Sequence, residues 1–300
     1  MATQTLEKPT TAVVKTDAER FTNMVIREFS GTVGTGLQMT AYQQKLAQHL
    51  FLKVDATLKE LEAKRLSKSN PTGTPITWAN INMPKLAIDA VHRVDLGLDA
   101  LIANHVHPIP YFNGKLQKYD LDLRIGYVGK DYYRRKFARE QPVNVIYELV
   151  YETDKFKPIK KGFKNDCDSY EFEITNVFDR GKVIGGFGYI MFEDPRKNVL
   201  VTIGPKQFNR SKAAAKANEF WERDEESMQF KTLVHRTMDK LPSDPEKVNE
   251  SFLAVEAEEA EERIIDGEIA ENANRGPVIE VKGDMQTGEI VEPDKKPDPF

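Results

Sequence analysis

The spacing of apolar residues changes along the chain, and this change limits the folds that it can adopt. From about Thr40 to Leu66 apolar side chains recur every three to four residues, the period of a helix that packs on one face. From Lys115 to Gly126 the period becomes two, as expected for a β-strand. Antiparallel strands followed by further helices favour an α+β fold.

Turn and helix-end signals divide the chain further. Pro84 suits the first turn of a helix that Gly97 ends, and Asn113-Gly114 is a strong hairpin signal. We expect a helical N-terminal region, then a central antiparallel β hairpin and meander with helices packed on it, and a disordered acidic C-terminal tail. Expected helices span 17–29, 40–66, 82–94, 129–140 and 205–241, and expected strands span 100–112, 115–126, 143–151, 169–176, 183–192 and 198–203.

Four units are expected along the chain. They are a disordered leader at 1–16, a helical assembly region at 17–80, a core at 81–245 and a flexible acidic tail at 246–300. The charge supports this division, because the last 50 residues hold 14 acidic and 5 basic residues while the first 250 hold 33 acidic and 38 basic residues. A basic body with an acidic tail points to a nucleic-acid partner.

Cysteine content and hydropathy indicate the compartment. The single cysteine, Cys167, excludes a disulfide framework and a multi-cysteine zinc site, and it fits a reduced cytoplasmic protein. The longest apolar stretch, Val183–Phe192, is about half the length of a membrane-spanning helix. We therefore expect a cytoplasmic protein without membrane association.

Candidates for catalysis are weak. His105 and His107 share a strand face and could ligate a metal, but polar residues on a partly exposed face are the favoured interpretation. Asp120 and Asp122 could hold Mg²⁺ in a nuclease, but a solvated strand face is favoured. Gly185–Gly188 lies inside a strand pattern, which indicates tight strand packing rather than a phosphate loop. We expect no catalytic residue, no metal and no cofactor.

Basic and aromatic residues gather in two runs. Arg124–Lys136 holds five basic residues and three tyrosines, and Lys206–Lys216 holds a second basic run. Cations neutralise phosphates and aromatic rings stack on bases, which together suit single-stranded nucleic acid. Solvated helix faces are the alternative, as is a solvated loop for the lysines of Phe156–Lys164. The candidate DNA-binding residues are Lys115, Arg124, Tyr127, Lys130, Tyr132, Arg134, Arg135, Lys206, Arg210, Lys212, Lys216 and Arg236.

From about Pro84 to Pro242 the chain resembles the RecT family of phage and prophage single-strand annealing recombinases. The most specific stretch is Trp221–Leu241, with a methionine and a Lys-Thr pair at the family's spacing, although His235-Arg236-Thr237-Met238 varies the family's ending. Val128 departs from the family, which has a lysine in the pattern Gly-Tyr-Lys-Gly. The other matching stretches are Leu86–Leu98, His105–Gly129 and Val143–Tyr151.

The resemblance implies ATP-independent binding of single-stranded DNA and annealing of complementary strands, with the nascent duplex held in a basic groove of an oligomeric ring or filament. It also implies a partner 5′–3′ exonuclease, and it makes the helix at Thr40–Leu66 a candidate subunit interface. The ending Asp298-Pro299-Phe300 resembles the tip of bacterial single-strand-binding proteins, so a host protein of that kind is a further candidate partner; a chance ending is the alternative. A replication accessory protein that binds single strands without annealing them also remains open.

Overall fold

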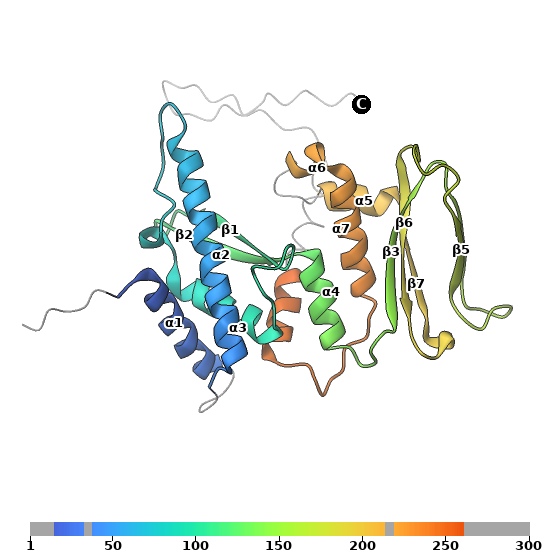
Figure 1. Ribbon diagram of the computed structural model, residues 1–300, viewed down its shortest axis with the longest axis horizontal. Coiled ribbons are helices and arrows are strands. Elements are labelled where there is room, and N and C mark those ends of the chain that lie inside the picture. Colours follow the sequence, from blue (N-terminus) through green and yellow to red (C-terminus); the bar gives the residue numbers. More distant parts are fainter. Residues whose placement is uncertain (1–14, 33–37, 214–218, 261–300) are drawn as a thin grey trace, which may run out of the picture.

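The computed structural model describes residues 15–32, 38–213 and 219–260 (Figure 1). The helices are α1 (Asp17–Thr32), α2 (Ala41–Leu66), α3 (Met83–Leu96), α4 (Tyr127–Lys136), α5 (Pro205–Ala213), α6 (Glu219–Arg223) and α7 (Glu225–Met238), with 3-10 turns η1 (Trp78–Asn80) and η2 (Pro195–Lys197). The strands are β1 (Val106–Asn113), β2 (Lys118–Ile125), β3 (Asn144–Tyr151), β4 (Lys155–Ile159), β5 (Ser169–Glu173), β6 (Val183–Met191) and β7 (Val199–Ile203). Residues 250–260 form a further helix. The expected α+β class is confirmed.

The N-terminal helices follow the sequence signals closely. A capping box starts α2, in which Thr40 Oγ1 accepts from the Gln43 N–H at 3.2 Å and the Gln43 side chain accepts from the Thr40 N–H at 2.9 Å. The buried face of α2 packs against α1 and α3, whereas Tyr42, the first residue of the predicted apolar stripe, is exposed. This face consists of Leu46, Ala47, Leu50, Val54 and Leu58.

The β1–β2 hairpin completes the N-terminal half of the molecule. Its strands pair from Val106 and Ile125 at one end to Asn113 and Lys118 at the other. The inward side chains of β2 are buried and face α3, as the period of two predicts. The expected strand at 100–112 begins only at Val106, because residues 100–105 form turns and a bend after Gly97, which ends α3 with a φ of 86°.

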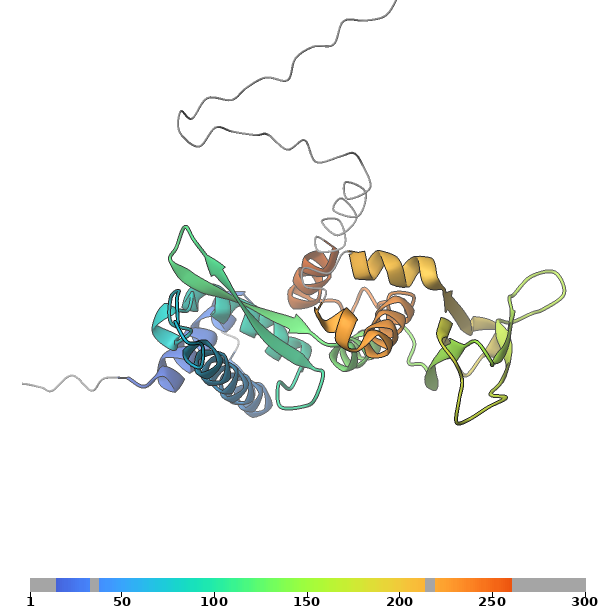
Figure 2. The same ribbon diagram turned by 90° about the horizontal axis from the view of Figure 1, so that it is seen from above.

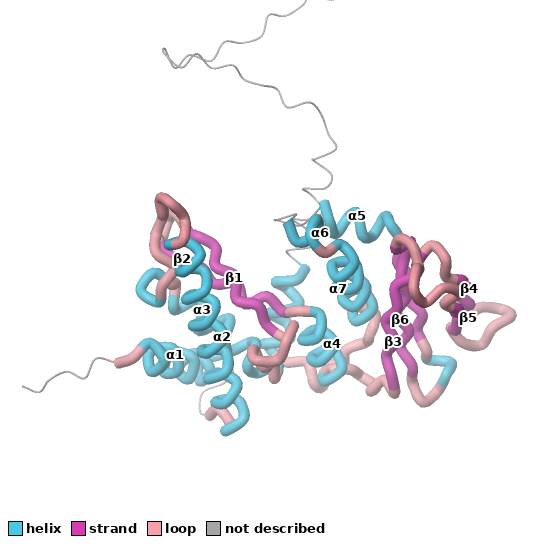
Figure 3. The backbone as a smooth tube through the Cα atoms, turned by 45° about the horizontal axis from the view of Figure 1, so that its top comes forward, coloured by secondary structure: helices cyan, strands magenta, loops and turns pink. Residues whose placement is uncertain are grey.

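The other half of the molecule is built on a three-stranded sheet. Strands β3, β6 and β7 make an antiparallel sheet in that order. Helices α7 and α5 cover one face, where Leu233 and Phe208 pack with Leu149 and Ile203. The β4–β5 hairpin covers the other face (Figure 1). Figure 3 shows α4 and α7 between the two groups of strands.

Two expectations for this half are wrong. The segment Phe156–Lys164 was expected as a loop, but its first residues belong to β4, which pairs with β5 and stacks the Phe156 ring on Phe187 at 4.6 Å. Pro158 and the short length hide this strand in the sequence. The expected helix at 205–241 is divided into α5, α6 and α7, and Asp224 caps the start of α7.

The glycines of β6 allow α7 to approach the sheet, in agreement with the sequence-based interpretation. A Cβ atom at Gly188 would lie 2.0 Å from Thr237 Oγ1 of α7. A bulkier residue would therefore separate the helix from the strand.

Residues 250–260 were assigned to the acidic tail, but they belong to the folded core. Phe252 and Val255 are buried together with residues of α1, α2 and α3. The Phe252 ring contacts those of Tyr133 and Phe137 at 5.8 and 5.0 Å. Figure 2 shows this helix in red-brown between the N-terminal half and the sheet. The leader, apart from Lys15 and Thr16, and the tail from residue 261 lie outside the described residues.

Candidate nucleic-acid interface

Three cationic side chains lie beneath the helix at residues 250–260, and we call them the capped cluster: Arg93, Lys130 and Arg134. Lys130 is fully buried. Its Nζ lies 2.7 Å from Asp239 Oδ1 and also pairs with Glu259. A buried cation needs such partners, because an unpaired charge in the interior is strongly destabilising.

The other two cations of the capped cluster are held in the same way. The Arg134 guanidinium lies 3.3 Å from Glu256 and donates to the Met238 carbonyl at 3.2 Å. Arg93 donates to the Leu123 carbonyl at 2.9 Å and pairs with Glu258 at 2.6 Å. Burial alone would lower the pKa of Arg93, but the Glu258 carboxylate outweighs it and raises that pKa.

Lys130 and Arg134 were both predicted to bind DNA. They share a face of α4, as their spacing predicts, and this face lies against α7 and the helix at 250–260. Tyr133 is fully buried beside them. Burial, together with the carboxylates of Glu259 and Glu256, raises the pKa of Tyr133. With the helix docked, none of these side chains is open to a ligand.

A second group of basic residues, which we call the seam, lies around His107 of β1: Lys53, His107, Arg124 and Lys231. They come from α2, the β1–β2 hairpin and α7, and all four are half-buried. Arg124 lies directly across the hairpin from His107. Burial, followed by the positive charges of Lys231 and Lys53, lowers the pKa of His107. The charges of Lys231 and Lys53 therefore reach His107 and favour its neutral form.

Sequence reasoning identified only part of the seam. Arg124 was predicted to bind DNA, and it pairs with Asp122 at 3.0 Å. Lys53 was missed, because a lysine on the polar face of an amphipathic helix carries no local signal. Lys231 entered only through the family resemblance.

The basic run of α5 stands apart from both groups. Lys206 and Arg210 are exposed, and neither forms an ion pair with a described residue. Lys212 pairs with Glu225 at 3.1 Å. Lys216 lies outside the described residues.

The remaining predicted cations are scattered. Lys115 is exposed in the hairpin turn, at the opposite end of the hairpin from Arg124. Arg135 pairs with Asp131 at 2.9 Å, and Arg236 is half-buried on α7. The structure thus does not bring the predicted cations to one surface.

The two predicted tyrosines have different surroundings. Tyr132 is 40% exposed, and its ring lies 5.6 Å from that of His105. Tyr127 lines a pocket of about 300 Å³ between β3 and α7. Aromatic rings make up much of this pocket, with Tyr147, Tyr151 and Phe230 beside Tyr127.

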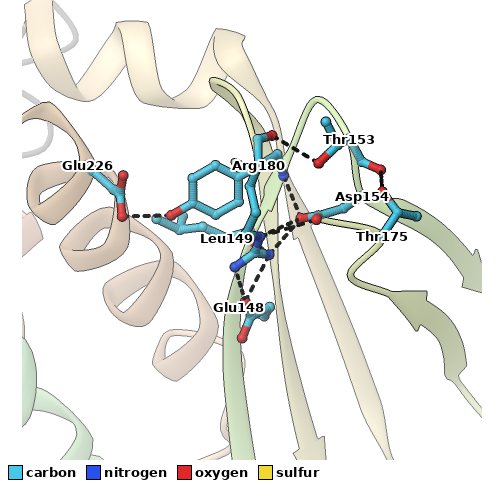
Figure 4. Close-up of polar contacts among 8 residues, drawn as sticks. Glu148, Leu149, Thr153, Asp154, Thr175, Arg180 and Glu226 are labelled. Carbon is cyan, nitrogen blue, oxygen red and sulfur yellow. Dashed lines mark hydrogen bonds and ion pairs between the residues drawn. The ribbon is translucent and has the colours of Figure 1, made fainter. Parts of the chain in front are cut away.

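The wall of this pocket is polar as well as aromatic (Figure 4). The Tyr151 hydroxyl donates to Glu226 at 2.6 Å, and burial with this carboxylate raises the pKa of Tyr151 to about 12. Behind the ring, the Arg180 guanidinium lies 4.1 Å from its centroid and pairs with Asp154 at 2.6 Å and Glu148 at 3.2 Å. Arg180 therefore joins the segment between β5 and β6 to β3.

The carboxylates considered for a nuclease are engaged with other side chains. Asp120 accepts from the side-chain amides of Asn82 at 2.7 Å and Asn113 at 2.9 Å, while Asp122 holds Arg124. Within residues 15–32, 38–213 and 219–260, no group of three or more His, Cys, Asp or Glu side chains could hold a metal ion. In the same residues no helix is long and apolar enough to cross a membrane.

The sequence was compared with the models of known protein families. The model of the RecT family matches residues 91–272, which include α4, the sheet, α7 and the helix at 250–260. A search of curated proteins gave no match. Because the family match covers more than half of the chain, this protein belongs to the RecT family and is a DNA-binding, single-strand annealing protein of recombination.

Proposed function

We propose that the protein binds single-stranded DNA in the cytoplasm and anneals it to its complement without ATP and without cutting it. The observation that carries this proposal is the RecT-family match over residues 91–272, which contain all the cations of the seam and the capped cluster except Lys53. We further propose that it acts as a homo-oligomeric ring or filament, with a 5′–3′ exonuclease that supplies the single strand and a host single-strand-binding protein as partners.

The seam suits the first step of annealing. Its half-buried basic side chains come from α2, the β1–β2 hairpin and α7, and together they could contact a phosphate backbone. Contacts to the backbone position a strand without reading its sequence and leave the base edges free for the incoming complement. Base pairing then supplies the specificity, and the protein needs no reactive group.

Order of addition tests the annealing step. Two complementary oligonucleotides added one after the other should give a stable complex with the protein and a duplex, and the preformed duplex should bind much more weakly. Gel shift and fluorescence energy transfer between labelled strands measure both. If preformed duplex binds equally well, the mechanism is wrong. Binding of single strands without faster pairing would instead indicate the replication accessory protein.

Salt dependence tests the residues. The double variants K53Q/K231Q and K206Q/R210Q each remove two cations. Each cation that contacts a phosphate of single-stranded DNA contributes about 0.7 to the slope of log K against log salt concentration. If the two cations of a pair both contact phosphates, the magnitude of the slope should therefore fall by about 1.4. The control K155Q/K157Q removes two exposed lysines of β4 that pair with Glu173 and Glu171. Fluorescence anisotropy at several salt concentrations gives the slopes, and a slope unchanged from wild type would exclude that pair from the DNA path.

A further inference from the structure

The helix at residues 250–260 places three successive acidic side chains on three different cations. Glu256 pairs with Arg134, Glu258 with Arg93, and Glu259 with Lys130. Glu256 and Glu259 are one turn apart, about 4.5 Å along a helix axis. The helix thus places one carboxylate against each cation of the capped cluster, where phosphates of a nucleic acid could take their place.

The apolar contacts of the same helix have a parallel in DNA. Phe252 covers the rings of Tyr133 and Phe137, at 5.8 and 5.0 Å between centroids. Without the helix, two aromatic rings would be uncovered beside three cations. Aromatic rings next to cations are what single-stranded nucleic acid requires, because bases stack on the rings while phosphates pair with the charges.

From this arrangement we infer that the helix at 250–260 occupies a phosphate- and base-binding site formed by the capped cluster with Tyr133 and Phe137, and that single-stranded DNA displaces it. This inference rests on the proposed function and names the regulation of the same DNA interface. Phosphates replace the three carboxylates and a base replaces the Phe252 ring, so no buried cation is left unpaired when the helix leaves.

The polar contacts of the helix allow such an exchange, which must also remove the buried side chains of Phe252 and Val255 from their apolar contacts. Its carboxylates are already partly in water, with side-chain exposures of 26% for Glu256, 43% for Glu258 and 19% for Glu259. Leu253, on its outer face, is 60% exposed. Ion pairs that water reaches are weakened by salt and are readily exchanged for other ion pairs.

Hydrogen exchange on the full-length wild-type protein tests the displacement directly. The amides of residues 250–260 should exchange at least about tenfold faster when a saturating oligothymidylate is bound, because the docked helix protects them in the free protein. Anisotropy of the same samples reports DNA binding. Unchanged or slower exchange with DNA bound overturns the inference and leaves the proposed function standing. Absence of DNA binding counts against both.

A variant in which the three carboxylates become neutral amides independently tests the competition between the helix and DNA. In E256Q/E258Q/E259Q the helix should no longer exclude DNA, and if the docked form is about 90% populated in wild type, affinity should rise by about tenfold. The control variant is E140Q/E171Q/E173Q, which changes the net charge by the same amount. Its three glutamates form exposed ion pairs with Lys197, Lys157 and Lys155. Equal gains in both variants would show an effect of net charge and refute the inference. Circular dichroism confirms folding, and the exchange experiment on wild type decides the matter if the triple variant is unfolded.

Discussion

Replacing Lys130 with methionine should lower the free energy of unfolding by about 3 kcal/mol, the lower end of the range for removing one partner of a buried ion pair. The lower end applies because Asp239 and Glu259, which would lose their cation, keep 27% and 19% of their side-chain surface in water. Denaturation in urea followed by circular dichroism measures the change.

The same substitution at an exposed lysine is the control for K130M. K206M removes an exposed lysine of α5 and should change the free energy of unfolding by no more than about 0.5 kcal/mol. If K130M is as stable as K206M, then Lys130 is not held as the structure shows.

Replacing Gly126 with alanine should destabilise the protein by about 3 kcal/mol, at the upper end for insertion of a methyl group into a packed site. The new Cβ would lie 2.3 Å from the Asn104 carbonyl oxygen, which is backbone and cannot turn aside as a side chain can. The same carbonyl accepts from the Gly129 N–H at 3.1 Å, and the His105 carbonyl accepts from the Gly126 N–H at 3.0 Å. The two chain segments are therefore held too close for any side chain at this position.

Gly114 provides the control for this variant. A Cβ there meets nothing within 4 Å, so G114A should leave the free energy of unfolding within about 0.5 kcal/mol of wild type. Thermal unfolding of both variants measures the difference. A G126A protein as stable as G114A would contradict the close approach of residues 104 and 126.

Elements with local signals were predictable. The glycine that ends α3 and the Asn113-Gly114 turn each depend on residues a few positions apart, and each is confirmed. Elements that depend on distant partners were not. β4 exists because β5 lies beside it, and the helix at 250–260 is fixed by Tyr133 and Phe137, more than 100 residues earlier.

The same limit applies to the candidate site. The spacing of Lys130 and Arg134 correctly places them on one face of a helix, but only the tertiary fold determines whether that face meets water or protein. Arg93 gave a usable signal, because a guanidinium between Val91 and Val94 on an apolar helix face must find a partner when buried. Its partner, Glu258, lies 165 residues away, and no local pattern connects them.

The docked helix also determines where the protein can be shortened. A chain that ends at residue 245, the boundary suggested by composition, loses Phe252 and Val255 from its interior along with the acidic residues. The rings of Tyr133 and Phe137 would then face solvent, and an apolar patch of that kind promotes self-association. Aggregation of such a shortened protein would report a damaged core, whereas a chain that ends just after residue 260 keeps these contacts.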